Sequence, residues 1–262
     1  MSKYGNPVRE ATTNPVKLTR ISIPNGPVTL AGLIYEPDFS PRNLCVVLAH
    51  GFTASKESMD LLANYLSLRG YPCLTFDFRG HKLGGSTGEI HHAIELVSDI
   101  EAAITWATHA FHRPHCALVG HSMGALIALV AARREEVAGV AAIATGTHPS
   151  RGFDTAIGAA MLLQRTDYVL GVSPRILLEQ FDCLTRYLEE LGQKPVLFVA
   201  ARGDGLVKPT RVRELAARFG PQVEFVEVEG GHLEAPDRAR GIVAAWLDKI
   251  SSCLGEEMEE RK

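Results

Sequence analysis

Residues 117–136, with the sequence ALVGHSMGALIALVAARREE, contain the pattern that decides the fold. The apolar run at 116–120 predicts a buried strand, and residues 122–134 predict a helix. Ser122 lies at the corner between them, with Gly120 and Gly124 two residues away on either side. A sharp strand–turn–helix corner crowds the backbone, and glycines at these two positions relieve the crowding. The pattern therefore predicts a serine exposed at the edge of a sheet, next to the N–H groups of a helix.

The rest of the chain alternates short apolar runs with longer amphipathic ones. Two runs around Asn25-Gly26-Pro27 predict an antiparallel hairpin. The other predicted strands cover residues 44–50, 72–78, 137–145, 195–201 and 222–230, and the other predicted helices cover 56–70, 91–110, 209–220 and 235–250. Strand–helix alternation with continuously apolar strands predicts an α/β fold, in which a mostly parallel eight-stranded sheet has helices on both faces.

The domain organisation follows from one interruption of this pattern. Residues 17–145 and 195–252 form the predicted core, and residues 146–194 contain helix-like pieces without a strand. Open α/β sheets bind ligands beyond the carboxyl ends of their strands, so we expect 146–194 to form a small helical cap there. Residues 1–16 are expected to be a flexible N-terminal segment, and 253–262 a charged tail.

The composition is that of an ordinary soluble globular protein. The chain has 262 residues, 46% hydrophobic and 22% charged, with a formal net charge of −3. This balance argues against a nucleic-acid surface, which needs a basic excess. No apolar run is long enough for a membrane span, and no secretory signal is recognisable, so we expect a cytoplasmic protein. A monomer and a homodimer both remain open.

The cysteines and histidines give no indication of a metal or a disulfide. The five cysteines form no C-x-x-C pair, and we expect buried free thiols. His109, His112 and His115 have a spacing that resembles a metal site, but the run contains Pro114 and no acidic partner. We therefore expect a solvated loop there and no metal.

A serine nucleophile needs a base, and the base needs an acid that orients it. Asp204 follows the predicted strand 195–201, and His232 follows the next strand, after two glycines. Because parallel strands end at the same edge of a sheet, Ser122, Asp204 and His232 are expected to meet there. Asp154, in the predicted cap, is a rival for the acid.

The same edge is expected to supply an oxyanion hole and a substrate pocket. The strand at 44–50 ends in His50-Gly51-Phe52, and we expect the backbone N–H groups of Phe52 and Met123 to be the donors. The residues expected to contact substrate are His50, His121, Phe153, Met161, Leu162 and Val207. The apolar cap residues among them could equally form the core of the cap itself. Two arginines of the cap, Arg151 and Arg165, could meet an acidic substrate, but arginines of a cap usually face solvent.

In order along the chain, HGF, DFRG, GHSMG, RGD and GGH resemble the motifs of the α/β-hydrolase superfamily. Within it the chain is similar to small carboxylesterases, to cinnamoyl (feruloyl) esterases and to serine-peptidase-like hydrolases of the S33 type. The resemblance implies that Ser122 is the nucleophile, Asp204 the acid and His232 the base, without any cofactor. The segment DFRGHKLGGSTGE departs from the usual pattern in its length and its histidine. We expect Asp77 and Arg79 in it to be structural.

These observations predict a serine hydrolase that cleaves carboxylic esters of small to medium acyl or aromatic acids through an acyl-enzyme. A thioesterase, an acylglycerol lipase and a C–C hydrolase would use the same three residues. A peptidase is less favoured, because the cap shows no acidic cluster that would hold a free amino terminus. From a different class, a non-catalytic ligand-binding module is the alternative, because a fold does not fix a function.

Overall fold

A computed structural model describes residues 15–39, 41–191 and 194–260 of the chain. Residues 1–14 of the expected N-terminal segment lie outside the described residues. Within the described ranges, no helix is both long enough and apolar enough to cross a membrane.

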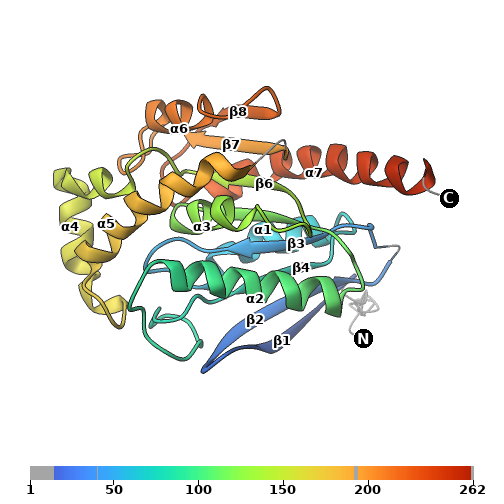
Figure 1. The fold of residues 1–262 in the computed structure, drawn as a ribbon, viewed down its shortest axis with the longest axis horizontal. Coiled ribbons are helices and arrows are strands. Elements are labelled where there is room, and N and C mark those ends of the chain that lie inside the picture. The colour runs from blue at the N-terminus through green and yellow to red at the C-terminus, as the bar shows by residue number, and fades with distance from the viewer. Residues whose placement is uncertain (1–14, 40, 192–193, 261–262) are drawn as a thin grey trace, which may run out of the picture.

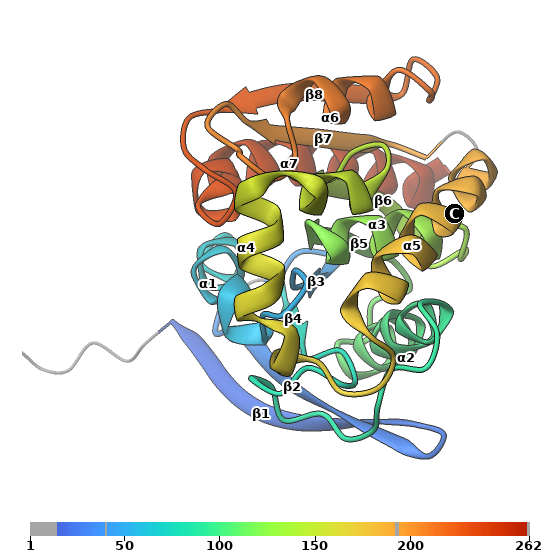
Figure 2. The ribbon, with the colours of Figure 1, turned by 90° about the vertical axis from the view of Figure 1, so that its left-hand side faces the viewer.

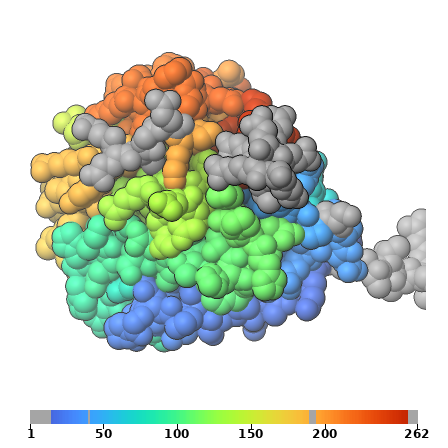
Figure 3. All heavy atoms as spheres, turned by 45° about the vertical axis from the view of Figure 1, so that its right-hand side comes forward, coloured from blue at the N-terminus to red at the C-terminus, as the bar shows by residue number. Residues whose placement is uncertain are grey.

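Eight strands form one sheet in the order β1-β2-β4-β3-β5-β6-β7-β8 (Figure 1). The pair β1–β2 is antiparallel, as the predicted hairpin requires, and the sheet is mostly parallel, as the sequence predicts. The pair β2–β4 is also antiparallel, which the sequence did not indicate. The strands are β1 (Val16–Asn25), β2 (Val28–Pro37), β3 (Cys45–Ala49), β4 (Cys73–Phe76), β5 (Cys116–His121), β6 (Val137–Ile143), β7 (Val196–Ala201) and β8 (Val223–Val228). The two ends of this order, blue and orange, lie on opposite sides of the molecule in Figure 3.

Helices cover both faces of the sheet. The core helices are α1 (Asp60–Ser67), which follows the short 3-10 helix η1 (Lys56–Met59), and α2 (Ile94–Ala110), α3 (Met123–Ala131), α6 (Pro209–Ala216) and α7 (Ala235–Glu260). One apolar core contains buried side chains of α2, α3 and α6, and the other contains those of α1 and α7. Strand β3 shows why both faces must be covered: Val46 and Leu48 pack in one core, and Val47 and Ala49 in the other.

The predicted cap is a set of short helices beyond the carboxyl ends of the strands (Figure 2). It consists of η2 (Pro149–Asp154), α4 (Ala156–Gln164), η3 (Thr166–Tyr168), α5 (Pro174–Leu184) and η4 (Thr185–Leu191). Helix α5 buries Leu177, Leu178 and Phe181 against the core that contains α3. In α4 only Gly158 is buried, and Leu163 is 80% exposed, so this apolar helix contacts the core weakly.

Several element boundaries differ from the sequence-based expectation. Helix α2 begins at Ile94 rather than at His91, because the Glu95 carboxylate accepts hydrogen bonds from the N–H groups of His91 and His92 outside the helix. The residues expected as a charged tail continue α7 to Glu260. The cysteines Cys45, Cys73 and Cys116 are buried free thiols as expected, but Cys183 and Cys253 are exposed.

The Asp77 carboxylate holds the unusual loop after β4 in place. It accepts hydrogen bonds from the backbone N–H of Lys56 at 2.7 Å and from that of Gly85 at 2.7 Å, and its other contact is the Lys56 ammonium at 2.6 Å. A Cβ at Gly84 would lie 2.3 Å from the Asp77 Cγ atom, so the loop passes closer than any other residue permits. The sequence therefore carries Gly84 because the chain folds directly over a buried carboxylate.

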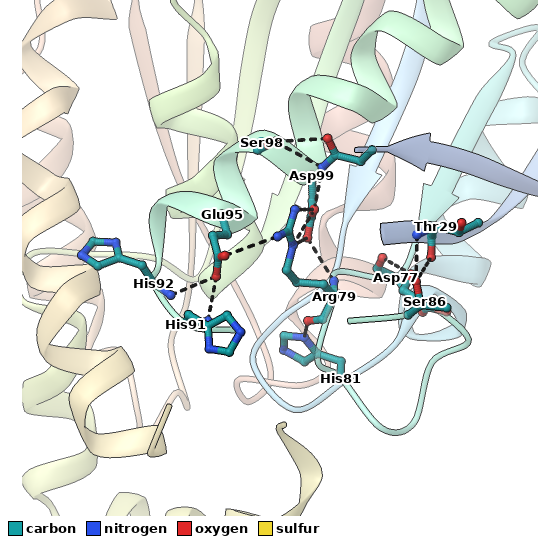
Figure 4. Close-up of polar contacts among 12 residues, drawn as sticks. Thr29, Asp77, Arg79, His81, Ser86, His91, His92, Glu95, Ser98 and Asp99 are labelled. Carbon is teal, nitrogen blue, oxygen red and sulfur yellow. Dashed lines mark hydrogen bonds and ion pairs between the residues drawn. The ribbon is translucent and has the colours of Figure 1, made fainter. Parts of the chain in front are cut away.

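Arg79 joins the same loop to α2 (Figure 4). Its guanidinium pairs with the fully buried Asp99 at 2.7 Å and with Glu95 at 3.5 Å. The backbone N–H of Arg79 also donates to the Asp99 carboxylate at 3.0 Å. These contacts agree with a structural role, as expected for Arg79, because a buried carboxylate requires a paired cation.

Candidate active site

The turn between β5 and α3 places Ser122 at the carboxyl edge of the sheet. Ser122 has φ 54° and ψ −115°, in the left-handed half of conformational space that side chains rarely adopt. Its N–H donates to the Ile143 carbonyl at 2.8 Å, so the neighbouring strand stabilises the turn. A Cβ at Gly120 or at Gly124 would lie 2.4 Å from a backbone atom of the facing segment. Only glycine fits at both positions, as the sequence pattern predicts.

Ser122, His232 and Asp204 form one chain of hydrogen bonds. The Ser122 hydroxyl lies 3.0 Å from the Nε2 atom of His232, and the His232 Nδ1 atom lies 2.7 Å from the Asp204 carboxylate. Because a carboxylate only accepts, the Nδ1–H donates to Asp204, and Nε2 accepts from the hydroxyl. This tautomer leaves Nε2 free to take the proton of Ser122.

Backbone N–H groups fix the carboxylate of Asp204. Its Oδ1 atom accepts from the N–H groups of Leu206 and Val207, each at 2.8 Å, and its Oδ2 atom accepts from His232. The side chain is fully buried, and these three donors hold one orientation. The rival acid, Asp154, is exposed at the end of η2.

The loop after β3 places the peptide between Gly51 and Phe52 close to Ser122. His50 accepts at Nε2 from the Phe78 N–H at 3.1 Å, so its Nδ1–H donates to the Gly51 carbonyl at 2.8 Å. The carbonyl and the N–H of one trans peptide point in opposite directions, and the Phe52 N–H therefore points away from His50. A Cβ at Gly51 would lie 3.4 Å from the Ser122 Cβ, which puts this peptide beside the serine.

The N–H groups of Phe52 and Met123 have no acceptor within the described part of the chain. Phe52 follows β3, and Met123 is the first residue of α3, where helical N–H groups lack partners. Two unpaired backbone donors, one on the loop after β3 and one directly after Ser122, are consistent with the predicted oxyanion hole, which stays a prediction.

Three buried histidines surround this edge. Burial lowers the pKa of His50 to about 4, that of His81 to about 3 and that of His121 to about 3. The neutral His121 donates from Nε2 to the His232 carbonyl at 2.9 Å, and its ring lies 4.8 Å from the His232 ring. His121 therefore positions His232, and His50 positions Gly51 and Phe52 in the loop after β3, which we call the oxyanion loop.

We expect the free energy of unfolding to fall below pH 6.5 because of these histidines. The pKa of each is lowered from 6.5 in the folded protein, so the unfolded chain binds more protons between pH 6.5 and about 4. Stability is complete above pH 6.5 and is lost as the pH decreases, by up to about 1.4 kcal/mol per unit for each buried histidine. Urea unfolding at a series of pH values measures this slope.

A variant tests the assignment to these side chains. His81→Gln removes one of the three buried imidazoles, so the slope should decrease by about a third. His109→Gln, at an exposed position on α2, should leave the slope unchanged. A flat stability between pH 6.5 and 4.5 in the wild type would contradict the prediction.

Two pockets meet at Ser122, and Phe52, Phe153 and His232 line both of them. The narrow pocket, of about 40 Å³, runs under the cap and is lined by the buried side chains of Leu126 and Phe181, among others. The wide pocket, of about 350 Å³, is lined among others by Leu83 and Leu233, whose side chains are 56% and 68% exposed.

The expected substrate contacts divide between these pockets, with two exceptions. Val207 lines the narrow pocket, and His121 and Met161 line the wide one. His50 is fully buried behind the oxyanion loop and lines neither pocket, because its ring packs between Phe78 and His81. Leu162 packs against the main core instead of the pocket.

Sequence reasoning missed two residues of this site, Thr53 and His81, and it left Arg165 between a solvent-facing position and a contact to an acidic substrate. Thr53 is buried at φ 60°, an unusual conformation for a β-branched residue, directly after Phe52. Arg165 lines the wide pocket rather than extending into solvent. His81 contacts Phe52 edge-on, with ring centroids 6.2 Å apart. The histidine in the unusual DFRGH segment was the available signal for His81, and nothing local marks Thr53.

Among the described residues, no three histidine, cysteine, aspartate or glutamate side chains gather in a way that could hold a metal ion. His109 lies near the end of α2 and His112 in the turn after it, and neither lines a pocket that contains Ser122.

Solved structures of esterases have the same fold. An esterase from Pyrococcus furiosus, Pf2001, superposes with a TM-score of 0.72 at 22% identity, over 90% of this chain and 92% of that one. A thermophilic esterase from Thermogutta terrifontis gives 0.66 at 19% identity, over 89% and 99%. An alpha-beta serine hydrolase homologue from Coxiella burnetii gives 0.64 at 21% identity, over 87% and 97%. At such identities the likeness concerns the fold.

No curated protein sequence matches the chain. The family model described as serine aminopeptidase, S33, matches residues 40–193, which include the Ser122 turn, the oxyanion loop and the cap. Because this match covers more than half of the 262 residues, the chain belongs to the serine aminopeptidase S33 family of α/β hydrolases.

Proposed function

We infer that the protein is a serine hydrolase that cleaves carboxylic esters of small to medium acyl or aromatic acids through an acyl-enzyme. The hydrogen-bond chain from Ser122 through His232 to Asp204, at the meeting point of two pockets, carries this inference. The depth of the narrow pocket favours the shorter acyl groups among these substrates.

The proposed reaction begins when the Ser122 oxygen attacks the acyl carbon while His232 Nε2 takes the hydroxyl proton. The N–H groups of Phe52 and Met123 stabilise the oxyanion, and Asp204 stabilises the imidazolium. His232 then returns its proton to the leaving alcohol oxygen as the carbon–oxygen bond breaks. A water that loses its proton to His232 attacks the acyl-enzyme, and the acid is released as Ser122 regains its proton.

The pockets favour an esterase over an aminopeptidase. None of the described residues that line either pocket is Asp or Glu. A substrate with a free α-ammonium group would therefore have no carboxylate with which to pair, although the family description refers to aminopeptidases.

The test is hydrolysis of p-nitrophenyl esters of increasing acyl length, together with labelling by a fluorophosphonate. We expect the highest kcat/KM for acetate to butyrate, and a decrease of at least about tenfold for octanoate, because a longer chain would overpack the narrow pocket. Leu178→Ala, which widens this pocket, should shift the optimum toward longer chains.

The outcomes separate this function from a binding module. A folded wild-type protein that neither hydrolyses any ester nor reacts with the fluorophosphonate would contradict the proposal and favour a non-catalytic role. Equal rates for acetate and octanoate in both wild type and Leu178→Ala would contradict the acyl assignment of the narrow pocket.

A further inference from the structure

The wide pocket contains one strong cation and no anion. Arg165, which follows α4, lines this pocket with Ser122 and His232, and none of the described lining residues is acidic. A second arginine of the cap, Arg151, is exposed and lines neither pocket. An unneutralised guanidinium beside a serine hydroxyl presents an attractive site for an anionic group.

The guanidinium of Arg165 is held by neutral partners. Its Nη1 atom donates to the Thr53 hydroxyl at 3.3 Å, and its Cζ atom lies 5.5 Å from the centroid of the Tyr168 ring. No carboxylate of the described residues lies within 4.0 Å of the Arg165 guanidinium. The nearby Asp167 pairs instead with Lys82, whose backbone N–H is bonded to the Tyr168 carbonyl. Its remaining N–H donors are therefore free for a ligand.

The backbone around these partners is fixed. The Tyr168 N–H donates to the Arg165 carbonyl at 3.0 Å, and the Tyr168 carbonyl accepts from the Lys82 N–H at 2.9 Å. Thr53 is buried at φ 60°, next to the oxyanion donor Phe52. Strained residues persist where surrounding contacts hold them, and they cluster at ligand sites. The Thr53 hydroxyl therefore contacts Arg165 although the positive φ of Thr53 is unfavourable for a β-branched residue.

The wide pocket is the side for the leaving group. In the proposed reaction the acyl group stays bonded to Ser122 while the alcohol departs, so the alcohol needs the side that opens to solvent. The wide pocket is the larger of the two and is lined by the exposed Leu83 and Leu233, whereas the smaller, narrow pocket is lined by buried core residues such as Leu126 and Phe181.

We propose that Arg165 binds an anionic group, a carboxylate or a phosphate, on the leaving group of the substrate. The guanidinium offers a charge-assisted hydrogen bond to either group, and Thr53 and Tyr168 orient it. The proposal rests on the proposed ester hydrolysis and adds a substrate class, namely esters of short acids with alcohols that carry a carboxylate or a phosphate. Arg165 is in this view a specificity residue that contacts substrate.

The experiment compares esters that differ only in charge. The matched pair is p-carboxyphenyl butyrate and p-carbamoylphenyl butyrate, whose substituents have nearly the same shape, and p-(phosphonomethyl)phenyl butyrate tests the phosphate. A fourth ester, p-carbamoylphenyl hemisuccinate, carries its carboxylate on the acyl side. The enzymes are wild type, Arg165→Gln, Arg165→Lys and, as the matched cap control, Arg151→Gln.

We expect the wild type to prefer one of the anionic leaving groups over the carboxamide by about tenfold or more in kcat/KM, mainly through KM. Arg165→Gln should abolish the preference, Arg165→Lys should restore part of it, and Arg151→Gln should keep it. The preference should weaken as the salt concentration rises. Whichever of the carboxylate and phosphate esters is favoured identifies the source of the anion.

Three results would overturn the proposal. One is a wild type that hydrolyses all butyrates equally, another is a preference that survives in Arg165→Gln, and the third is a preference that appears only with the hemisuccinate. If no ester is hydrolysed and Ser122 reacts with no fluorophosphonate, the ester-hydrolase function itself fails, which is a distinct outcome.

Discussion

Replacing Ser122 with alanine is expected to lower kcat/KM for p-nitrophenyl butyrate by at least about 10⁴-fold and to abolish labelling by a fluorophosphonate. The hydroxyl oxygen lies 3.0 Å from His232 Nε2, and in the proposed reaction the N–H groups of Phe52 and Met123 stabilise the oxyanion that forms at it. Without it the base has no proton to remove. Steady-state hydrolysis and the labelled fraction after gel separation measure the two effects.

The fold should survive this substitution, because alanine keeps the backbone N–H that bonds to Ile143. Circular dichroism and the thermal midpoint check this point. Ser252→Ala, which removes an exposed hydroxyl on α7, is the matched control and should hydrolyse and label as the wild type does. Residual activity within tenfold of the wild type in Ser122→Ala would show that another residue is the nucleophile.

Asp204→Asn is expected to lower kcat by about 10³–10⁴-fold with little change in structure. The asparagine carbonyl can still accept from the N–H groups of Leu206 and Val207, so its amide NH₂ must face His232 Nδ1. The Nδ1 atom of His232 then has to accept a hydrogen bond from this amide, so the imidazole proton moves to Nε2 and points at Ser122. The imidazole can no longer act as a base, although every heavy atom stays in place.

The measurement is kcat on an ester of the optimal acyl length, together with fluorophosphonate labelling over hours. Labelling should become slow rather than vanish, because Ser122 and the two oxyanion donors remain. Asp237→Asn, on the surface of α7, serves as the control for loss of one negative charge. A decrease of less than about tenfold in Asp204→Asn would contradict its role as the orienting acid and would return attention to Asp154.

The two predictions concern the chemistry, whereas the cap decides what reaches it. Phe153, on η2, lines both pockets and contacts Phe52 edge-on, with ring centroids 6.3 Å apart. The cap is joined to the loop after β4 by backbone hydrogen bonds from Leu170 to Gly80 and from Val172 to Ile90. The length of this loop, which departs from the usual pattern, is therefore matched to the position of the cap.

The sequence alone determines the fold and the placement of the reacting residues, for local reasons. Gly120 and Gly124 mark a turn that excludes any Cβ, and this steric requirement is visible within five residues. Asp204 and His232 each follow an apolar run, and parallel strands necessarily end at the same edge. The periodicities of strands and helices then predict the order of the remaining elements. The predicted boundaries err by a few residues where a side chain bonds backbone groups outside a helix, as Glu95 does with His91 and His92 just before α2.

Only the tertiary structure decides what lies around those residues. Arg165 looks like a solvent-facing cap arginine in the sequence, and it becomes a pocket residue because Thr53, 112 positions away, accepts its hydrogen bond. His50 looks like a substrate contact, and burial behind the oxyanion loop makes it a support for Gly51 instead. Pocket width and the neutral state of the buried histidines depend likewise on the packing of segments distant in the chain, because burial and side-chain direction are properties of contacts that no local pattern encodes.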